Sequence, residues 1–302
     1  MSVATDTVRG VPRRRERARV GVHDDGQGSE AQLLVPADQV QQWAANTYRV
    51  RSCELVLNRT VDPLPGSQLD QADAIYRWEK ISVWARSYLL AATESLCLWA
   101  DLVAPYDLVP DAVNRVRMRP YLLLARSGLE AVAHAIWLLD VPTRTFEECV
   151  QRHVRLMHHD FTLHKQALDA RGSDAGRIED RIAKLKERAA GLPFEVTPTD
   201  KPPGYEKLVR NAATVVGQDA NEWAYLWKAA SGAGHGQNWF GIEGFDLRPT
   251  REYEPGHFRT MSVPDPVYIT EMIEAAAGAL VWGTTRWLDY GGYDRSLMFT
   301  AM

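Results

Sequence analysis

The longest apolar stretch of the chain lies near its middle, at residues 119–140. Its hydrophobic side chains fall all round the 3.6-residue period of a helix, so little of such a helix should face water. They are Leu122, Leu123, Leu129, Val132, Ile136, Leu138 and Leu139. Pro120 near the start and Pro142 just beyond the end bound the segment. The pattern therefore predicts a core helix around which the other elements pack.

Three ionisable side chains interrupt this apolar helix along one side. Arg126, Glu130 and His134 follow one another at intervals of four residues, which places them in a single line. A buried charge without a partner is strongly destabilising. The line must therefore pair within itself, pair with a neighbouring helix, or hold a ligand.

Further segments show helical spacing of apolar residues or helix-capping signals. Thr145 with Glu148 forms a capping box, and Asp265 precedes a proline at the first helical position. The expected helices cover approximately residues 36–60, 72–102, 119–140, 145–170, 174–190, 205–216, 220–231 and 265–291. Residues 242–263 lack helical spacing and predict an irregular β-hairpin or a long loop. The expected fold class is all-α, a single bundle of about eight helices over residues 36–302.

Charge separates an N-terminal tail from this bundle. Residues 1–35 mix Arg, Gly, Asp and Ser without an apolar period, which predicts a disordered tail. Residues 1–20 hold six arginines against two acidic residues, a net charge of +4, whereas the whole chain carries −4. The remainder is therefore too acidic for a broad phosphate-binding surface, although a local basic face could persist within it. The tail itself could bind RNA or an acidic protein partner.

The cysteines and the hydropathy pattern indicate a compartment. Cys53, Cys97 and Cys149 lie in separate predicted helices and form no C-x-x-C pair, as is typical of buried thiols in a reducing environment. No uninterrupted apolar run reaches the roughly 18 residues that a membrane-spanning helix needs. The N-terminal arginines are not followed by the apolar region of a secretory signal. We therefore expect a cytoplasmic protein without a membrane segment.

The short connection near residue 142 predicts that helices 119–140 and 145–170 form an antiparallel pair. Facing residues should then have numbers that sum to about 285. On this register three pairs face each other across the interface: Arg126 with Asp160, Glu130 with Arg155, and His134 with His153. The first interpretation is thus a buried polar network of interhelical ion pairs that needs no cofactor.

A metal site is the alternative interpretation of the same register. Glu130 and His134 lie four residues apart on one helix face, and His153 is the matched third side chain. Two imidazoles and one carboxylate leave open positions on a non-haem iron or zinc ion. However, the spacing is not the Glu-x-x-His of di-iron bundles.

Two further constellations could support catalysis. Arg152, Arg155 and His159 share one face of helix 145–170, and a histidine beside arginines can serve metal-independent RNA cleavage as proton acceptor and phosphorane-stabilising cations. Such charge runs are also typical of a solvated helix face. In the small-residue run 229–236, Ser231 and His235 could touch, but we expect His235 rather to hydrogen-bond the charged line of helix 119–140 and fix the helix packing.

Two segments resemble a widespread group of helical proteins allied to the HEPN superfamily. One is the Arg126-x-x-x-Glu130 helix, and the other is Trp227-Lys-x-x-Ser-Gly-x-x-His235-Gly. The resemblance implies a helical bundle in which these segments pack together, frequent homodimerisation, and a role in RNA cleavage or in stress and defence. In active HEPN nucleases an Arg and a His are four to six residues apart, and Ala230 stands where that Arg would precede His235. Arg152 with His158 or His159 supplies the spacing instead.

Overall fold

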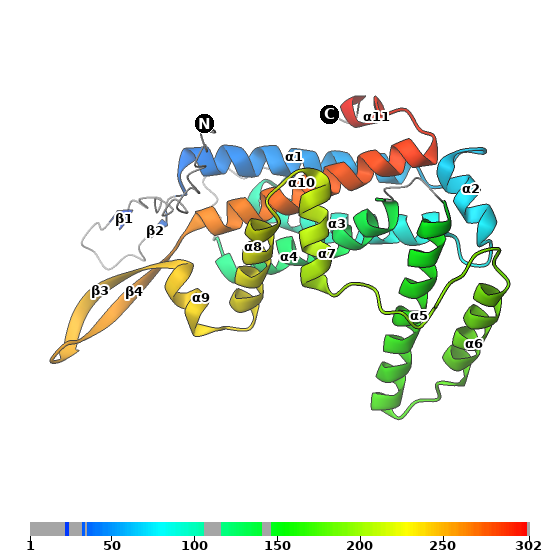
Figure 1. Ribbon diagram of the computed structural model, residues 1–302. Coiled ribbons are helices and arrows are strands. Elements are labelled where there is room, and N and C mark those ends of the chain that lie inside the picture. Colours follow the sequence, from blue (N-terminus) through cyan, green and yellow to red (C-terminus); the bar gives the residue numbers. More distant parts are fainter. Residues whose placement is uncertain (1–21, 24–31, 34, 106–115, 141–145, 301–302) are drawn as a thin grey trace, which may run out of the picture.

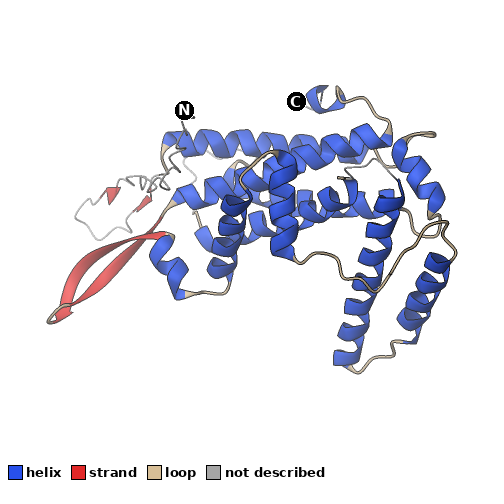
Figure 2. Cartoon of the chain, in the orientation of Figure 1, coloured by secondary structure: helices blue, strands red, loops and turns tan. Residues whose placement is uncertain are grey.

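Helices make up most of the structure. The computed structural model describes residues 22–23, 32–33, 35–105, 116–140 and 146–300 (Figure 1). Within these ranges there are eleven helices and two small antiparallel sheets (Figure 2). The helices are α1 (Ala37–Arg59), α2 (Gln68–Ile75), α3 (Ile81–Val103), α4 (Met118–Leu139), α5 (Phe146–Arg171), α6 (Gly176–Ala190), α7 (Tyr205–Val216), α8 (Ala220–Gly234), α9 (Asn238–Glu243), α10 (Pro266–Gly291) and α11 (Leu297–Thr300). The expected all-α bundle with a hairpin is confirmed. Thr145 and most of the expected tail lie outside the described residues.

The helix expected at 72–102 is divided into α2 and α3. Asp73 of α2 is buried and accepts hydrogen bonds from the backbone N of Ser82, at 3.0 Å, and from its hydroxyl. This carboxylate therefore binds one of the free amides in the first turn of α3, where a negative charge is favourable. Burial raises the pKa of Asp73, and the hydrogen bonds from Ser82 counter part of that rise. The apolar stripe continues through the break, so periodicity could not reveal it.

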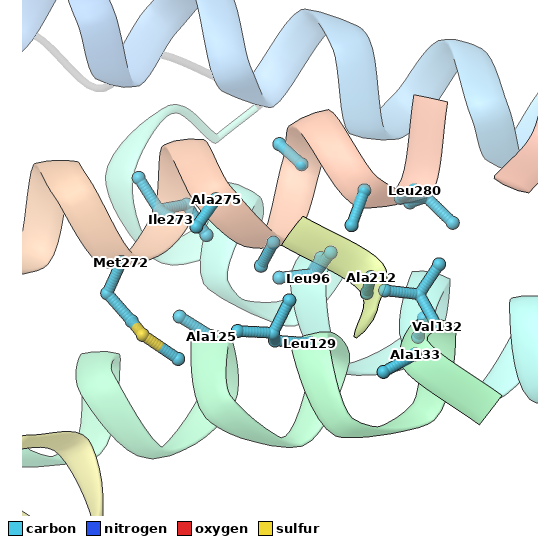
Figure 3. Packing of buried hydrophobic residues seen from close by; sticks show 14 of the residues in the cluster. Leu96, Ala125, Leu129, Val132, Ala133, Ala212, Met272, Ile273, Ala275 and Leu280 are labelled. Carbon is cyan, nitrogen blue, oxygen red and sulfur yellow. The ribbon is translucent and has the colours of Figure 1, made fainter. Parts of the chain in front are cut away.

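α4 lies at the centre of the bundle and packs against α3, α7, α8 and α10, while α1 lies along α3 and α10. Figure 3 shows the apolar side chains at this centre. Those labelled are Leu96, Ala125, Leu129, Val132, Ala133, Ala212, Met272, Ile273, Ala275 and Leu280. A Cβ at Gly128 would lie 2.7 Å from Leu96 Cγ, so this glycine sets how closely α3 and α4 approach. The predicted core helix is thus confirmed.

By length and composition alone α4 could cross a membrane, and it is the one such helix in the described ranges. Its most apolar window is 56% buried inside the bundle, as in the core helix of a soluble protein. The apolar surface of α4 is therefore largely used by its neighbours.

α5 does not form the expected antiparallel pair with α4. It runs away from the bundle and packs against α6 and α2 (Figure 1). Except for Leu156, which reaches the main core, its buried apolar side chains belong to a second, smaller core that Tyr76 and the start of α3 also join. The members of this core contributed by α5 and α6 are Cys149, Val150, Val154, Met157, Phe161, Ile178, Leu185 and Ala189. Because α5 buries its apolar face against α6, the register that sums to 285 does not apply.

Strands β3 (Phe245–Glu254) and β4 (His257–Pro264) form an antiparallel hairpin that projects from the bundle (Figure 1). We call this hairpin the arm. β3 contains Pro249 and two register irregularities, between Pro249 and Arg251 and between Glu252 and Glu254, whereas the opposing residues of β4 are consecutive. A proline and bulges are typical of a protected sheet edge. A second pair, β1 (Val22–His23) with β2 (Gln32–Leu33), lies apart from it.

Candidate functional site

The charged line of α4 pairs within itself and with α8. Arg126 Nε donates to Glu130 Oε1 at 2.8 Å, and the two side chains are only 21% and 19% exposed. The indole N–H of Trp227, on α8, donates to the same oxygen at 2.6 Å. The Arg126 guanidinium also lies over the Trp227 ring, 5.1 Å from its centroid. The two segments that carry the HEPN resemblance are therefore in direct contact.

The partners that the sequence predicted for Arg126 and Glu130 on α5 were wrong. Asp160 is exposed, and Arg155 forms its ion pair with Asp200 at 3.2 Å instead of with Glu130. The reason is the departure of α5 from the bundle, which carries both residues away from the expected register. Of the predicted polar network, the structure thus brings together Arg126 and Glu130, and Trp227 takes the place of a partner on α5.

His134 continues the line within an aromatic cluster. Its Nδ1 donates to the Glu130 carbonyl at 2.9 Å, and its ring is stacked on Tyr88 with 4.9 Å between centroids. Tyr205 meets the same ring edge-on at 5.5 Å. Burial lowers the pKa of His134 and raises that of Tyr88. The imidazole is therefore held neutral and serves as a packing group.

His153 lies elsewhere than the metal interpretation required. Its ring is fully buried, and Nε2 donates to the Glu79 carbonyl at 2.8 Å. It contacts Trp84, which contacts Tyr88, so two aromatic rings stand between His153 and His134. Burial lowers the pKa of His153 to about 4. In the described ranges no three His, Cys, Asp or Glu side chains form a group that could hold a metal ion.

The arginines of α5 have structural partners. Arg152 donates to the carbonyls of Trp137 and Asp140, both at 2.6 Å, and so caps the end of α4; it also pairs with Glu148. Arg152 and Arg155 line a depression of about 550 Å³ together with Lys201. Buried Arg155 Nε has no hydrogen-bond acceptor in the described part of the chain. His159 is half-buried on the same helix but is not part of the depression.

The junction after α8 is crowded at its glycines and not at His235. A Cβ at Gly232 would lie 2.7 Å from Trp239, and one at Gly234 would lie 2.5 Å from Leu123. His235 caps the helix through its backbone N, which donates to Ser231 O at 3.0 Å, and its side chain is exposed. The expected lock between α8 and α4 therefore comes from Trp227 and Gly234, while Gly232 lets Trp239 of α9 approach and His235 faces solvent.

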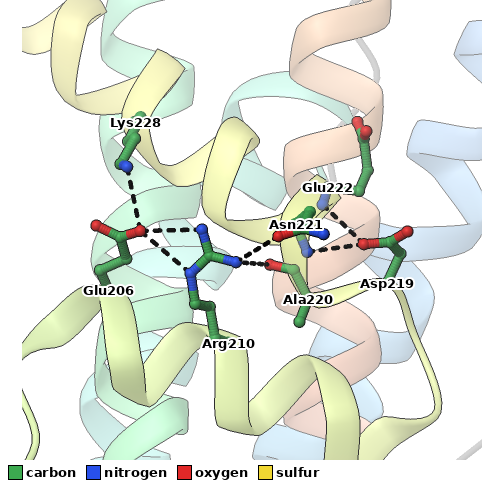
Figure 4. Close-up of polar contacts among 7 residues, drawn as sticks. All are labelled: Glu206, Arg210, Asp219, Ala220, Asn221, Glu222 and Lys228. Atoms are coloured by element: carbon green, nitrogen blue, oxygen red, sulfur yellow. Dashed lines mark hydrogen bonds and ion pairs between the residues drawn. The ribbon is translucent and has the colours of Figure 1, made fainter. Parts of the chain in front are cut away.

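α7 and α8 are joined by a polar network that the sequence pattern did not predict (Figure 4). Glu206 forms ion pairs with Arg210 at 3.0 Å and Lys228 at 3.1 Å, and Arg210 also donates to Asn221 Oδ1 at 2.7 Å. These two cations hold the pKa of the Glu206 carboxyl below its usual value. Asp219 caps α8, as expected, by accepting from the backbone N of Asn221. The network is satisfied internally and fixes α7 against α8.

The arm carries a basic face. Arg251 and Arg259 are directly opposite each other in the β3–β4 register, so their side chains share one face. Both side chains are exposed, and the described part of the chain gives neither an ion pair. Arg248, opposite Met261 on the same face, is paired with Asp246 at 2.8 Å. Over the whole arm Asp246, Glu252 and Glu254 match its three arginines in number, so the positive charge that no ion pair balances is that of Arg251 and Arg259 alone.

Apolar side chains accompany this charge along the arm. Leu247, Tyr253 and Phe258 are 39%, 56% and 49% exposed. An isolated two-stranded hairpin is marginally stable in water, and little of this one is buried by the bundle. Exposed aromatic and arginine side chains on a projecting ribbon are typical of a binding element.

Comparison with known proteins adds no relative: no protein-family model, curated protein or solved structure matches this chain significantly.

Proposed function

We propose that this protein binds nucleic acid through the arm, with the Arg251/Arg259 face against the phosphate backbone. The observation that carries the proposal is the pair itself. Like charges directly opposite each other destabilise a sheet, and here neither arginine has an acidic partner in the described ranges. A polyanion supplies the missing countercharge.

The shape of the arm favours a DNA duplex over an RNA duplex. A two-stranded β-ribbon fits the major groove of B-form DNA, which is about 12 Å wide, whereas the major groove of an RNA helix is too narrow to admit it. Residues 21–302 carry a net charge of −8, the whole-chain −4 less the +4 of residues 1–20, so the body around the arm repels DNA and favours contact through the arm.

Fluorescence anisotropy with a short labelled DNA duplex tests the proposal. Replacing both Arg251 and Arg259 by Ala should weaken binding at least tenfold and lower the slope of log K against log salt by about 1.8, because each lost phosphate contact removes about 0.9. Arg177→Ala is the matched control, because it removes another exposed arginine, from α6. Its affinity and its salt slope should stay close to those of the wild type.

Arg259→Glu separates binding from folding. It places a carboxylate opposite Arg251 and should stabilise the hairpin by about 0.2–1 kcal/mol. It should nevertheless abolish duplex binding. Unchanged affinity in Arg259→Glu, or tighter binding of single-stranded RNA than of duplex DNA, would overturn the proposal.

A second candidate is the metal-independent RNase implied by the HEPN resemblance. It is favoured by Arg155, whose buried Nε has no acceptor and which lies one helical turn before His159. RNA incubated with the protein in EDTA should be cleaved, and His159→Ala should stop cleavage while leaving duplex binding unchanged. If the RNA stays intact, the nuclease candidate is ruled out and the nucleic-acid-binding proposal alone remains. Homodimerisation and a cytoplasmic location belong to the same proposal, and light scattering tests the first.

The metal-dependent alternative also has a direct measurement. Elemental analysis of protein purified without chelator should show about one iron or zinc per chain if Glu130, His134 and His153 rearrange into a site. If no iron or zinc is found at that stoichiometry, the metal-dependent alternative is ruled out.

A further inference from the structure

The end of α2, α5 and α6 lie together, far from the arm (Figure 1). A small notch is lined by residues from the turn after α2, the middle of α5 and α6. Its volume is about 240 Å³. Arg181, Lys184 and Arg188 line it from α6, where spacings of three and four residues put them on one helix face. Tyr76 and Phe161 line the opposite side.

The notch carries an excess of positive charge. Glu79 is its one acidic lining residue, and it is paired with Arg181 at 2.8 Å. Lys184 is exposed and has no ion pair in the described part of the chain, and neither has Arg188. Two cations four residues apart on a helix repel each other. The excess of two charges therefore favours an anion between them.

Aromatic rings hold both guanidinium groups in place. Arg181 lies over the Phe161 ring at 4.3 Å from its centroid, and Arg188 lies over Trp78 at 5.2 Å. Cation–π contacts of this kind orient the planar fork before a ligand arrives, which reduces the entropy lost on binding. Leu185 and Phe161 are buried beneath these cations and support them, so the accessible lining of the notch is mainly polar.

From this arrangement we propose that the notch is a binding site for a small phosphorylated molecule, whose phosphate lies between Lys184 and Arg188. An arginine fork beside a lysine is suited to phosphate oxygens. The site shares no residue with the arm, so it goes beyond the proposed nucleic-acid function.

Isothermal titration with inorganic phosphate and with phenyl phosphate tests this site at constant ionic strength. Both should bind saturably. Lys184→Ala should weaken phenyl phosphate binding about tenfold through loss of a charge-assisted contact. Lys186→Ala is the matched control, since Lys186 is exposed two residues along the same helix but does not line the notch.

Two further measurements separate this site from the fold and from the arm. Lys184→Ala should leave the melting temperature of the free protein unchanged, because its side chain is exposed and unpaired in the described ranges. Replacement of Arg251 and Arg259 by Ala should leave phenyl phosphate binding intact, which separates this site from the arm. The proposal is overturned if wild-type protein shows no saturable binding of either anion, or if Lys186→Ala weakens binding as much as Lys184→Ala.

Discussion

Trp227 holds both members of the Arg126–Glu130 pair, one by its N–H and the other by its ring. The indole N–H is 2.6 Å from Glu130 Oε1, and the ring centroid is 5.1 Å from Arg126 Cζ. A half-buried ion pair gains stability when its remaining hydrogen-bonding positions are filled. One aromatic side chain on α8 thus completes the charged line of α4 and joins the two helices.

Replacement of Trp227 by Phe should destabilise the fold by about 1–3 kcal/mol, because a hydrogen bond to a charged, half-buried acceptor is lost while most of the ring remains. Urea unfolding followed by circular dichroism measures this. Trp239→Phe is the control: Trp239 also donates, to Gln237 at an exposed site, and its loss should cost less than about 0.5 kcal/mol. Equal effects of the two substitutions would contradict the role given to Trp227.

Two glycines in core helices should respond oppositely to alanine. At Gly128 the new Cβ would meet Leu96 at 2.7 Å, so Gly128→Ala should destabilise the protein by about 1–3 kcal/mol. At Gly278, in α10, nothing lies within 4 Å, and Gly278→Ala should stabilise by about 0.5–1 kcal/mol through helix propensity. The two melting temperatures, measured against wild type, should therefore move in opposite directions.

His153 should make the fold acid-sensitive. Burial lowers its folded-state pKa to about 4, while an unfolded histidine titrates near 6.5. Between these values the unfolded chain binds more protons, so the free energy of unfolding falls as pH decreases through this window, by about 3 kcal/mol in total. Urea unfolding from pH 7.5 to 4.5 should show the fall.

His153→Gln isolates this contribution. The amide can still donate to the Glu79 carbonyl but does not titrate. The difference between the wild-type and variant pH profiles should have the slope described above. A variant profile parallel to that of wild type would show that another group causes the acid sensitivity.

All three cysteines should be unreactive in the folded protein. Burial raises the pKa values of Cys53, Cys97 and Cys149 to about 12, and Cys97 also donates toward Glu54 Oε2 at 3.5 Å. Because the thiolate is the reactive form, iodoacetamide at pH 8 should modify native protein far more slowly than protein unfolded in urea. Mass spectrometry counts the labels, and rapid labelling of one native cysteine would contradict its raised pKa.

The helical architecture followed from sequence where the signal was local. Asp265 accepts from Val267 N and begins α10, and Gly292 ends it in the left-handed conformation, as capping rules require. The pairing of α4 with α5 was not local. The apolar residues of α5 suit either α4, which precedes it, or α6, which follows it, and the core on the α6 side is completed by Tyr76 and the start of α3, which lie far away in the sequence.

The candidate sites also comprise features that the local sequence pattern predicted and features that it did not. Periodicity identified Arg126, Glu130 and His134 as an enclosed line, and the structure confirms that enclosure. It did not identify Trp227 as their partner, although an indole N–H in an apolar helix is a donor that needs an acceptor. The Arg251/Arg259 pair escaped notice because two bulges in β3 set which residues face each other, and a sequence pattern does not show bulges.

The irregular course of β3 also limits how far the arm can associate. With Pro249 and two bulges on β3, the outer edge of β4 is the regular one, so an added strand would pair there. Two copies joined through β4 would present only their interrupted β3 edges to a third. Growth would stop at a closed two-fold dimer instead of continuing into a fibre.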